Sequence, residues 1–324
     1  MVSYRPNGAR TVGDPRRARQ EADIHDYDAF GLRFHSDLSL PELTPAAADR
    51  PPDVRIVVAP LSPRLEGAAD LPPRMQAGPD AFQLDVDAGR YRVTDGRLIT
   101  IDPAPGASPR DVRLFLLGSA MGALCHQRSR LALHAAALEI DGAAIAVAGP
   151  SGAGKSTLAA LHAAAGGGVL GDDLCAVSWD GTGAPVAHRG LGRIKLWRDS
   201  AELAGWTPDE STRIADAIDK FGGPTLRGAP SLPLSGLYVL RPDSGAATAT
   251  FRRLVGPEAA MAAVAQIYRW PLAVAMGRSA DLFDQAVALA RRCPVFELDF
   301  THDVRAPDRL RTTLIRHAGS RVEP

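Results

Sequence analysis

Residues 149–156 are the part of the sequence whose residue types and spacing are best suited to chemistry. They read GPSGAGKS and fit the pattern G-x-x-x-x-G-K-[ST], in which backbone N–H groups cradle phosphate oxygens. In this pattern the Lys155 ammonium reaches the β- and γ-phosphates, and the Ser156 hydroxyl binds Mg²⁺. We therefore predict a site for a nucleoside triphosphate and Mg²⁺. The residues predicted to contact the nucleotide are Gly149, Pro150, Ser151, Gly152, Ala153, Gly154, Lys155, Ser156 and Thr157.

Two adjacent carboxylates, Asp172 and Asp173, follow this glycine-rich loop after a short apolar run. Next to bound phosphates, such a pair suits two tasks: one carboxylate holds Mg²⁺, and the other accepts a proton from an attacking hydroxyl. A pair that only holds the metal, as in ATPases, fits the spacing equally well. The chain has no Asn-Lys-x-Asp guanine motif, and the Ser-Gly of PLSGLY lies in a predicted strand, so the signature of transporter ATPases is missing.

The residues around the glycine-rich loop predict the elements that position it. AIAVAG before the loop is typical of a short buried strand, and KSTLAALHAA after it consists of good helix formers. Asp141-Gly142 joins two apolar runs and predicts a hairpin. Further strands are predicted at 174–179, 237–240 and 295–300, and helices from 108 and at 257–269, 279–292 and 307–317. We therefore predict an α/β domain with a mixed central sheet over residues 106–324.

Residues 25–105 are predicted to form a small β-rich module in front of that domain. Residues 27–43 favour a short strand with a proline stop, and residues 54–60 favour another strand. Residues 81–102 alternate between apolar and polar around turns at DAG and DGR, which predicts an antiparallel meander. Residues 1–24 are polar and lack the apolar region of a secretory signal, so we expect a disordered tail there.

The overall composition excludes several kinds of partner. The 37 Lys and Arg balance 37 Asp and Glu, so no net field recruits nucleic acid or an anionic membrane. The most apolar stretch, residues 131–149, contains Glu139 and Asp141 and is not a membrane span. Three dispersed cysteines fit buried thiols in a reducing compartment rather than a disulfide framework or a zinc cluster. These features predict a cytoplasmic protein.

The order of several motifs resembles the catalytic domain of the HPr kinase/phosphorylase family, bacterial enzymes that phosphorylate a serine on a small protein. The sequence has His134 in HAAALEIDG, then the glycine-rich loop, then GDD, then HRGLG, all within residues 131–195. The resemblance implies a bacterial serine kinase that uses ATP and Mg²⁺. It also implies Asp173 as the proton acceptor, Lys155 and Ser156 as phosphate and metal residues, and His134 as an active-site histidine.

The sequence departs from that family in two places. Ala187 stands where the family has a metal-associated glutamate, which makes Asp172 the expected metal partner of Ser156 and removes support for reverse phosphorolysis. The N-terminal module does not resemble the regulatory domain of the typical family member. Instead YDAFGLRFHSDLSLPEL, GRIKLW and DKFGGP look like a subgroup associated with ribosomally made peptides, including lasso peptides. That resemblance implies phosphorylation of a serine at the C-terminus of a precursor peptide.

Basic residues after the carboxylate pair complete the predicted site. We expect Lys155 and further basic groups to stabilise the transferred phosphoryl group, with Arg189 acting as a catalytic residue. The further candidates for phosphate or substrate contacts are Arg193, Lys195 and Lys220. RGLGRIKLW is rich in glycine and favours a loop near the site, although a solvated strand face fits its charges equally well. DKFGGP fits either a lid that reaches the phosphates or an inert surface loop.

The predicted function is Mg²⁺-dependent transfer of phosphate from ATP to a serine of a peptide or small protein, by a chain whose family relatives form homo-oligomers. A small-molecule kinase, a phosphate-loop ATPase that drives a partner and a non-catalytic nucleotide sensor remain alternatives, because all three use the same loop. Pyrophosphate as the donor also fits. His134 on an apolar strand is equally consistent with a core residue. Trp197 and Trp206 are predicted to pack against the protein rather than to form a peptide groove.

Overall fold

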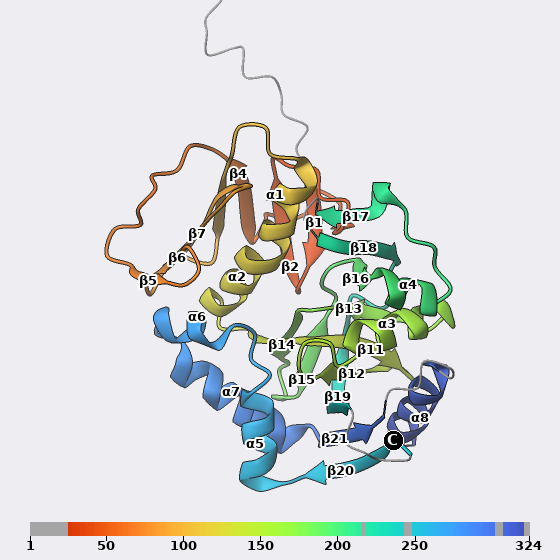
Figure 1. Cartoon of the computed structure of the whole chain (residues 1–324). Coiled ribbons are helices and arrows are strands. Elements are labelled where there is room, and N and C mark those ends of the chain that lie inside the picture. Colours follow the sequence, from red (N-terminus) through yellow and green to blue (C-terminus); the bar gives the residue numbers. More distant parts are fainter. Residues whose placement is uncertain (1–24, 216–217, 243–247, 302–306, 321–324) are drawn as a thin grey trace, which may run out of the picture.

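The computed structural model describes residues 25–215, 218–242, 248–301 and 307–320 (Figure 1). Two large β-sheets and one small sheet form its framework, and helices cover the large sheets. This is the mixed α/β architecture predicted from the sequence. The tail predicted for residues 1–24 lies outside the described residues.

The first sheet contains the strands of residues 25–103 in the order β3-β1-β2-β4-β9-β8-β7-β6-β5. They are β1 (His25–Ala29), β2 (Leu32–Ser36), β3 (Thr44–Pro45), β4 (Val54–Val58), β5 (Ala69–Leu71), β6 (Met75–Ala77), β7 (Ala81–Val86), β8 (Gly89–Thr94) and β9 (Leu98–Pro103). The predicted meander is confirmed, because β7, β8 and β9 pair antiparallel. The sheet as a whole is mixed, since β4 runs parallel to both of its neighbours.

The single strand predicted for residues 27–43 is wrong, because β1 and β2 form a hairpin. Its two turn residues, Phe30 and Gly31, both have positive φ, at 54° and 69°. Such a turn normally carries Asn, Asp or Gly at both positions, so the apolar Phe30 concealed it in the sequence. The Phe30 side chain is fully buried, which shows that tertiary packing holds the turn in this conformation.

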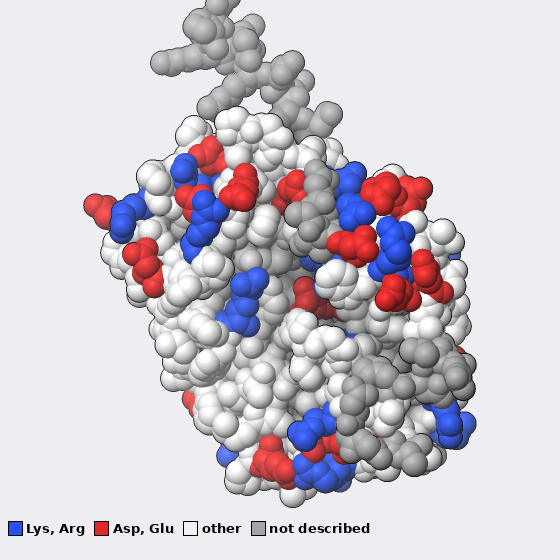
Figure 2. Space-filling view, in the orientation of Figure 1, with Lys and Arg blue, Asp and Glu red and all other residues white. Residues whose placement is uncertain are grey.

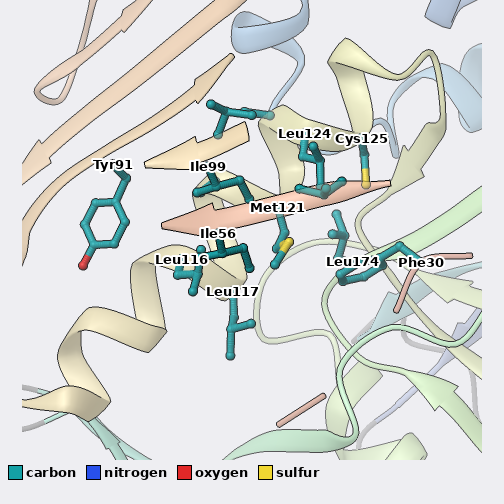
Figure 3. Packing of buried hydrophobic residues seen from close by; sticks show 14 of the residues in the cluster. Phe30, Ile56, Tyr91, Ile99, Leu116, Leu117, Met121, Leu124, Cys125 and Leu174 are labelled. Carbon is teal, nitrogen blue, oxygen red and sulfur yellow. The ribbon is translucent and has the colours of Figure 1, made fainter. Parts of the chain in front are cut away.

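A helical segment packs on the first sheet. The Ser108 side chain accepts a hydrogen bond from the Asp111 N–H, and Pro109 occupies the first turn, where no N–H is needed. The segment continues through α1 (Pro109–Phe115), a π-helical turn (Leu116–Ala120) and α2 (Met121–Gln127). Figure 3 shows its buried side chains packed with those of the sheet. The residues labelled there are Phe30, Ile56, Tyr91, Ile99, Leu116, Leu117, Met121, Leu124, Cys125 and Leu174.

The second sheet carries the glycine-rich loop and has the order β10-β14-β15-β19-β12-β11-β13, with β21 on β19 and β20 on β21. Its strands are β10 (Leu131–Leu133), β11 (Ala135–Ile140), β12 (Ala143–Ala148), β13 (Val169–Gly171), β14 (Cys175–Trp179), β15 (Pro185–His188), β19 (Ser231–Pro242), β20 (Thr250–Leu254) and β21 (Val295–Phe300). The hairpin predicted at Asp141-Gly142 is confirmed between β11 and β12. Parallel pairing of β12 with β19, and of β19 with β21, makes this sheet mixed.

Helices cover both faces of the second sheet, and the alternation along β12 shows why. Ala146 belongs to a core shared with α5 (Gly256–Val264) and α7 (Ser279–Arg292), whereas Val147 belongs to a core shared with α3 (Lys155–Ala164) and α8 (Pro307–Gly319). Every residue of β12 is therefore buried. This explains why the strand reads as a continuous apolar run rather than as an alternating one. No helix of the described ranges is long and apolar enough to cross a membrane.

The third sheet corrects two predictions. Of RGLGRIKLW, predicted as a loop near the site, residues 189–192 lie outside any strand, whereas the rest forms β16 (Arg193–Trp197). DKFGGP, predicted as a lid or a surface loop, lies in β18 (Ile218–Thr225). β18 pairs with both β16 and β17 (Arg213–Ala215). Along β16, Ile194 and Leu196 are buried, and the alternating Arg193 and Lys195 are partly exposed on the opposite face of the strand. Short α4 (Arg198–Leu203) follows β16 and contacts α3.

Candidate active site

The glycine-rich loop, residues 149–156, connects β12 to α3 as the sequence predicted. Gly149, Gly152 and Gly154 have φ values of 142°, 82° and 94°, a backbone region that residues with a Cβ rarely adopt. A Cβ at Gly149 would also lie 3.0 Å from the carbonyl oxygen of Leu240 on β19. The glycines are therefore required by the path of the loop itself, whatever it binds.

Lys155, the first residue of α3, folds back over the loop. Its Nζ donates hydrogen bonds to the carbonyl oxygens of Gly149 at 2.8 Å and Pro150 at 3.0 Å. Burial lowers the pKa of the Lys155 ammonium, and the negative charges of Asp172 and Asp173 oppose that shift. The ammonium thus lies against the backbone of the loop, within the field of both carboxylates.

Asp172 joins the loop to the third sheet. The Ser156 hydroxyl donates a hydrogen bond to Asp172 Oδ1 at 3.0 Å, and the Lys195 N–H donates one to Oδ2 at 3.3 Å. The Asp172 side chain is buried. Burial raises its pKa, and the charge of Asp173 adds to the effect. An additional cation beside this carboxylate would therefore be stabilising.

A hydroxyl and a carboxylate in contact fit Mg²⁺, which prefers oxygen ligands. No group of three or more His, Cys, Asp or Glu suited to a metal occurs in the described part of the chain. Mg²⁺ is commonly held by one or two protein groups, with phosphate oxygens and water completing its coordination. Ser156 and Asp172 would therefore hold the ion only together with a bound triphosphate.

Asp173 has a different environment from its neighbour. Its side chain is 41% exposed, and its Oδ1 lies 3.2 Å from Nδ1 of His134. The same Nδ1 is 3.0 Å from the Asp173 carbonyl oxygen, so we assign the proton to Nδ1, because both of its neighbours are acceptors. Asp173 also has a left-handed backbone (φ 71°), which directs it away from a regular strand path. One carboxylate of the pair is thus buried against the loop, and the other is accessible and supported by a histidine.

The four basic candidates lie at different places around this pair. Lys195 on β16 interacts electrostatically with Asp172, and Lys220 on β18 with Lys155. Lys220 also lies over the ring of Trp197, 4.8 Å from its centroid, and Trp197 is 54% exposed. Of the two predicted roles, core or packing residue, the exposure of Trp197 excludes the core role, and its ring packs against Lys220. The predicted packing of Trp206 is confirmed, because it lies partly buried against the core beneath α3.

Arg193 and Arg189 complete the basic set. Arg193 is half-buried on β16. The Nε of Arg189 is buried and has no hydrogen-bond partner among the described residues, so a bound anion would satisfy this donor. On the face drawn in Figure 2, a central hollow contains acidic atoms and has Lys or Arg atoms at its edge.

Residues 189–192 are attached to the first sheet at both ends. The Phe30 N–H donates to the Arg189 carbonyl oxygen at 2.6 Å, and the Gly192 N–H donates to the Glu42 carbonyl oxygen at 2.6 Å. A Cβ at Gly190 would lie 2.7 Å from the Phe30 ring, so the ring packs directly on the main chain. We call this arrangement the Phe30–Glu42 clamp. It places the first sheet in contact with a segment of the candidate site, which sequence reasoning missed.

Residues 265–269 are a second part of the site that sequence reasoning missed. The helix predicted for 257–269 ends at Val264, and the following residues turn toward β10. The His134 N–H donates to the Gln266 carbonyl oxygen at 2.7 Å, and the rings of His134 and Tyr268 have centroids 6.1 Å apart. Continued apolar spacing masked the end of the helix. The available signal was QIYRWP, in which the proline follows two aromatic residues and an arginine.

Comparison with known proteins gives no family assignment. No family model and no curated protein matches the chain. Among solved structures, the chain is similar to the Hpr(Ser) kinase/phosphatase from Coxiella burnetii, with 14% sequence identity and a TM-score of 0.32. The match covers 57% of this chain and 95% of that one. A similarity at this level identifies neither the activity nor the substrate of the present chain.

Proposed function

We propose that the chain is a Mg²⁺-dependent kinase that transfers the γ-phosphoryl group of ATP to a serine of a peptide or small protein. The observation that carries the proposal is the division between two adjacent carboxylates. Asp172 is buried and bonded to Ser156 of the glycine-rich loop, whereas Asp173 is accessible and bonded to His134. A metal-holding carboxylate beside an accessible one is the arrangement needed for phosphate transfer to a hydroxyl.

The residues of the chain have separate roles in the proposed transfer. Backbone N–H groups of the loop and Lys155 hold the β- and γ-phosphates. Mg²⁺, held by Ser156 and Asp172, would neutralise charge on the phosphate oxygens. Asp173 takes the proton of the serine hydroxyl while His134 Nδ1–H holds the carboxylate in position.

The proposed phosphate transfer forms one bond to the γ-phosphorus and breaks another. A bond forms between the serine oxygen and the γ-phosphorus, and the bond from that phosphorus to the bridging β–γ oxygen breaks. ADP leaves with the electron pair of the broken bond, and the hydroxyl proton stays on Asp173.

The acceptor that we propose is the C-terminal serine of a lasso-type precursor peptide. Support for this substrate comes from the three sequence segments that resemble kinases associated with such peptides. Two of them meet in the fold, because the segment containing Phe30 and Glu42 is bonded to the residues that lead into β16. The same contact gives the N-terminal sheet a direct connection to the site.

Substitution of Asp173 by Asn tests the proposal. Loss of a positioned base reduces a rate by about a hundred- to ten-thousandfold, so Asp173→Asn should lose transfer to serine peptides by that factor. Its affinity for a fluorescent ATP analogue with Mg²⁺ should change little. Asp95→Asn is the matched control, because Asp95 is an exposed aspartate with positive φ (53°) on the β8–β9 turn.

The acceptor is identified by incubating the protein with [γ-³²P]ATP and with serine peptides or metabolites. Label in peptides that disappears in Asp173→Asn, and persists in Asp95→Asn, supports the proposal. Retained transfer in Asp173→Asn would remove the base role. ATP hydrolysis without a labelled acceptor would indicate an ATPase, and label only in metabolites would indicate a small-molecule kinase.

A further inference from the structure

Residues 265–269 form a rigid wall beside His134. Besides the bond from the His134 N–H to Gln266, Ile267 forms a β-bridge with Leu133, and the Tyr268 N–H donates to the Ala132 carbonyl oxygen at 2.8 Å. The Tyr268 carbonyl oxygen is bound in turn by Nε2 of the buried His126 at 2.8 Å. Both main-chain polar groups of Tyr268 are therefore fixed, and its ring is buried to 7% exposure.

Arg269, which ends this wall, is held in an unusual conformation. It has a left-handed backbone (φ 48°), which a residue with a long side chain rarely adopts. Its Nε donates to the Tyr268 hydroxyl at 3.2 Å, and its guanidinium carbon lies 5.5 Å from the centroid of the Tyr268 ring. The fixed ring thus orients an exposed guanidinium.

The charge of Arg269 is not neutralised within the described part of the chain, where no carboxylate lies within ion-pair distance of it. Other arginines of the surface differ, as Arg252 shows by contacting both Glu258 and Glu297. Arg269 uses one donor for Tyr268, and the outer nitrogens of its planar group remain available. Such a group binds carboxylates with two parallel hydrogen bonds.

Separate contacts connect the carboxylate pair to the glycine-rich loop and to Arg269. Asp172 is bonded to Ser156 of the loop. Asp173 contacts His134, the His134 ring lies 6.1 Å from the Tyr268 ring, and the Tyr268 hydroxyl accepts a hydrogen bond from Arg269. Since the loop and Lys155 serve the phosphates, an anion at Arg269 belongs to the acceptor that approaches Asp173.

We propose that Arg269, oriented by Tyr268, binds a carboxylate of the acceptor peptide and so selects acceptors with a negative charge near the serine. This inference rests on the proposed function, because it takes Asp173 as the point to which the acceptor comes. The carboxylate comes either from an Asp or Glu side chain or from the free C-terminus. Both sources present the same planar oxyanion to the guanidinium.

The test measures peptide binding separately from phosphate transfer. Fluorescent serine peptides with randomised flanks are prepared in four pools that form two matched pairs. The first pair has Glu or Gln beside the serine, and both of its pools have an amidated C-terminus. The second pair ends in serine and has either a free or an amidated C-terminus. Anisotropy with protein saturated with Mg·ADP gives the affinity for each pool. We expect a carboxylate pool to bind about tenfold more tightly than its amide counterpart, as one charge-assisted contact provides.

Arg269→Asn removes the charge without opposing the backbone, because Asn tolerates left-handed conformations. It should abolish the discrimination between carboxylate and amide pools, and Arg269→Lys should keep part of it. Tyr268→Phe should weaken it, because the guanidinium loses its hydrogen bond. Arg74→Asn is the matched control, since Arg74 is also a surface arginine with positive φ (57°), paired with Asp87.

Each outcome decides the inference. Discrimination that is lost in Arg269→Asn and kept in Arg74→Asn supports it, and the pool concerned identifies the source of the carboxylate. Equal affinity for carboxylate and amide pools in the unaltered chain, or unchanged discrimination in Arg269→Asn, overturns it. Phosphate transfer to the same peptide pools is measured in parallel samples that contain Mg·ATP in place of Mg·ADP. If the chain distinguishes carboxylate from amide pools but transfers no phosphate, the carboxylate site is supported and the kinase proposal is rejected. If it transfers phosphate but binds both kinds of pool equally, the kinase proposal is supported and the carboxylate site is rejected.

Discussion

His126 should make the stability of the protein fall as the pH drops below neutrality. The side chain is completely buried in α2, and its Nε2 lies 2.8 Å from the Tyr268 carbonyl oxygen. Its Nδ1 is buried without a hydrogen-bond partner among the described residues. A proton on Nδ1 would therefore place a charged donor in an apolar environment. Burial lowers the pKa of His126 from 6.5 to about 4, and the hydrogen bond to Tyr268 offsets only part of this shift.

The sign of the effect follows from which state binds the proton. Below pH 6.5 the unfolded chain protonates His126, whereas the folded chain does so only near pH 4. The contribution to stability is therefore complete above pH 6.5 and is lost as the pH falls toward 4. One pKa unit corresponds to about 1.4 kcal/mol, which gives a loss of about 2 kcal/mol between pH 7 and pH 5.

Urea unfolding of the unaltered chain and of His126→Gln at pH 7, 6 and 5 measures this loss. Glutamine does not titrate, and its amide can donate to the Tyr268 carbonyl oxygen. We expect His126→Gln to be less stable at pH 7 but to lose about 2 kcal/mol less between pH 7 and pH 5. Burial also lowers the pKa of His188 to about 4. Both proteins contain His188, so its contribution cancels when their two curves of stability against pH are subtracted. Parallel curves would refute the assignment of His126 as a buried neutral base.

Two further predictions concern the loop and the clamp. Ser156→Ala should raise the Mg²⁺ concentration needed for half-maximal phosphate transfer, because the proposed ion loses the hydroxyl that would hold it together with Asp172. An unchanged Mg²⁺ midpoint would contradict the proposed metal site. Phe30→Ala should lower the free energy of unfolding by about 3–5 kcal/mol, because it empties a fully buried site between the first sheet and Gly190. If urea unfolding shows a loss below about 1 kcal/mol, the ring does not support residues 189–192.

The local features of the candidate site could be predicted from the sequence. The glycines of the loop, the Asp141-Gly142 turn and the helix beginning at Lys155 each depend on residues close in the chain. Local backbone preferences therefore suffice to place them. The chemistry expected of Asp172 and Ser156 required only that a strand end lie beside the loop, and their hydrogen bond agrees with that expectation.

The features that the sequence concealed depend on distant partners. The glycines of β18 suggested a loop, but Gly222 pairs with Lys195 of β16, and a Cβ on it would lie 3.4 Å from the Thr212 carbonyl oxygen. Residues 265–269 continued the apolar spacing of α5, yet pairing with β10 ends the helix. In both cases tertiary contacts overrode local propensity. For residues 265–269 the local signal was the proline of QIYRWP, and for β18 no local pattern marks the strand pairing.

The Phe30–Glu42 clamp bears on any attempt to exchange parts of this protein. Both hydrogen bonds join main-chain atoms, Phe30 N–H to Arg189 and Gly192 N–H to Glu42, so they depend on the backbone path of the first sheet rather than on its side chains. A chimaera carrying a foreign N-terminal sheet would have to reproduce that path and supply a ring of matching size at position 30. In this respect the first sheet and the half that carries the glycine-rich loop depend on each other, and neither can be exchanged alone.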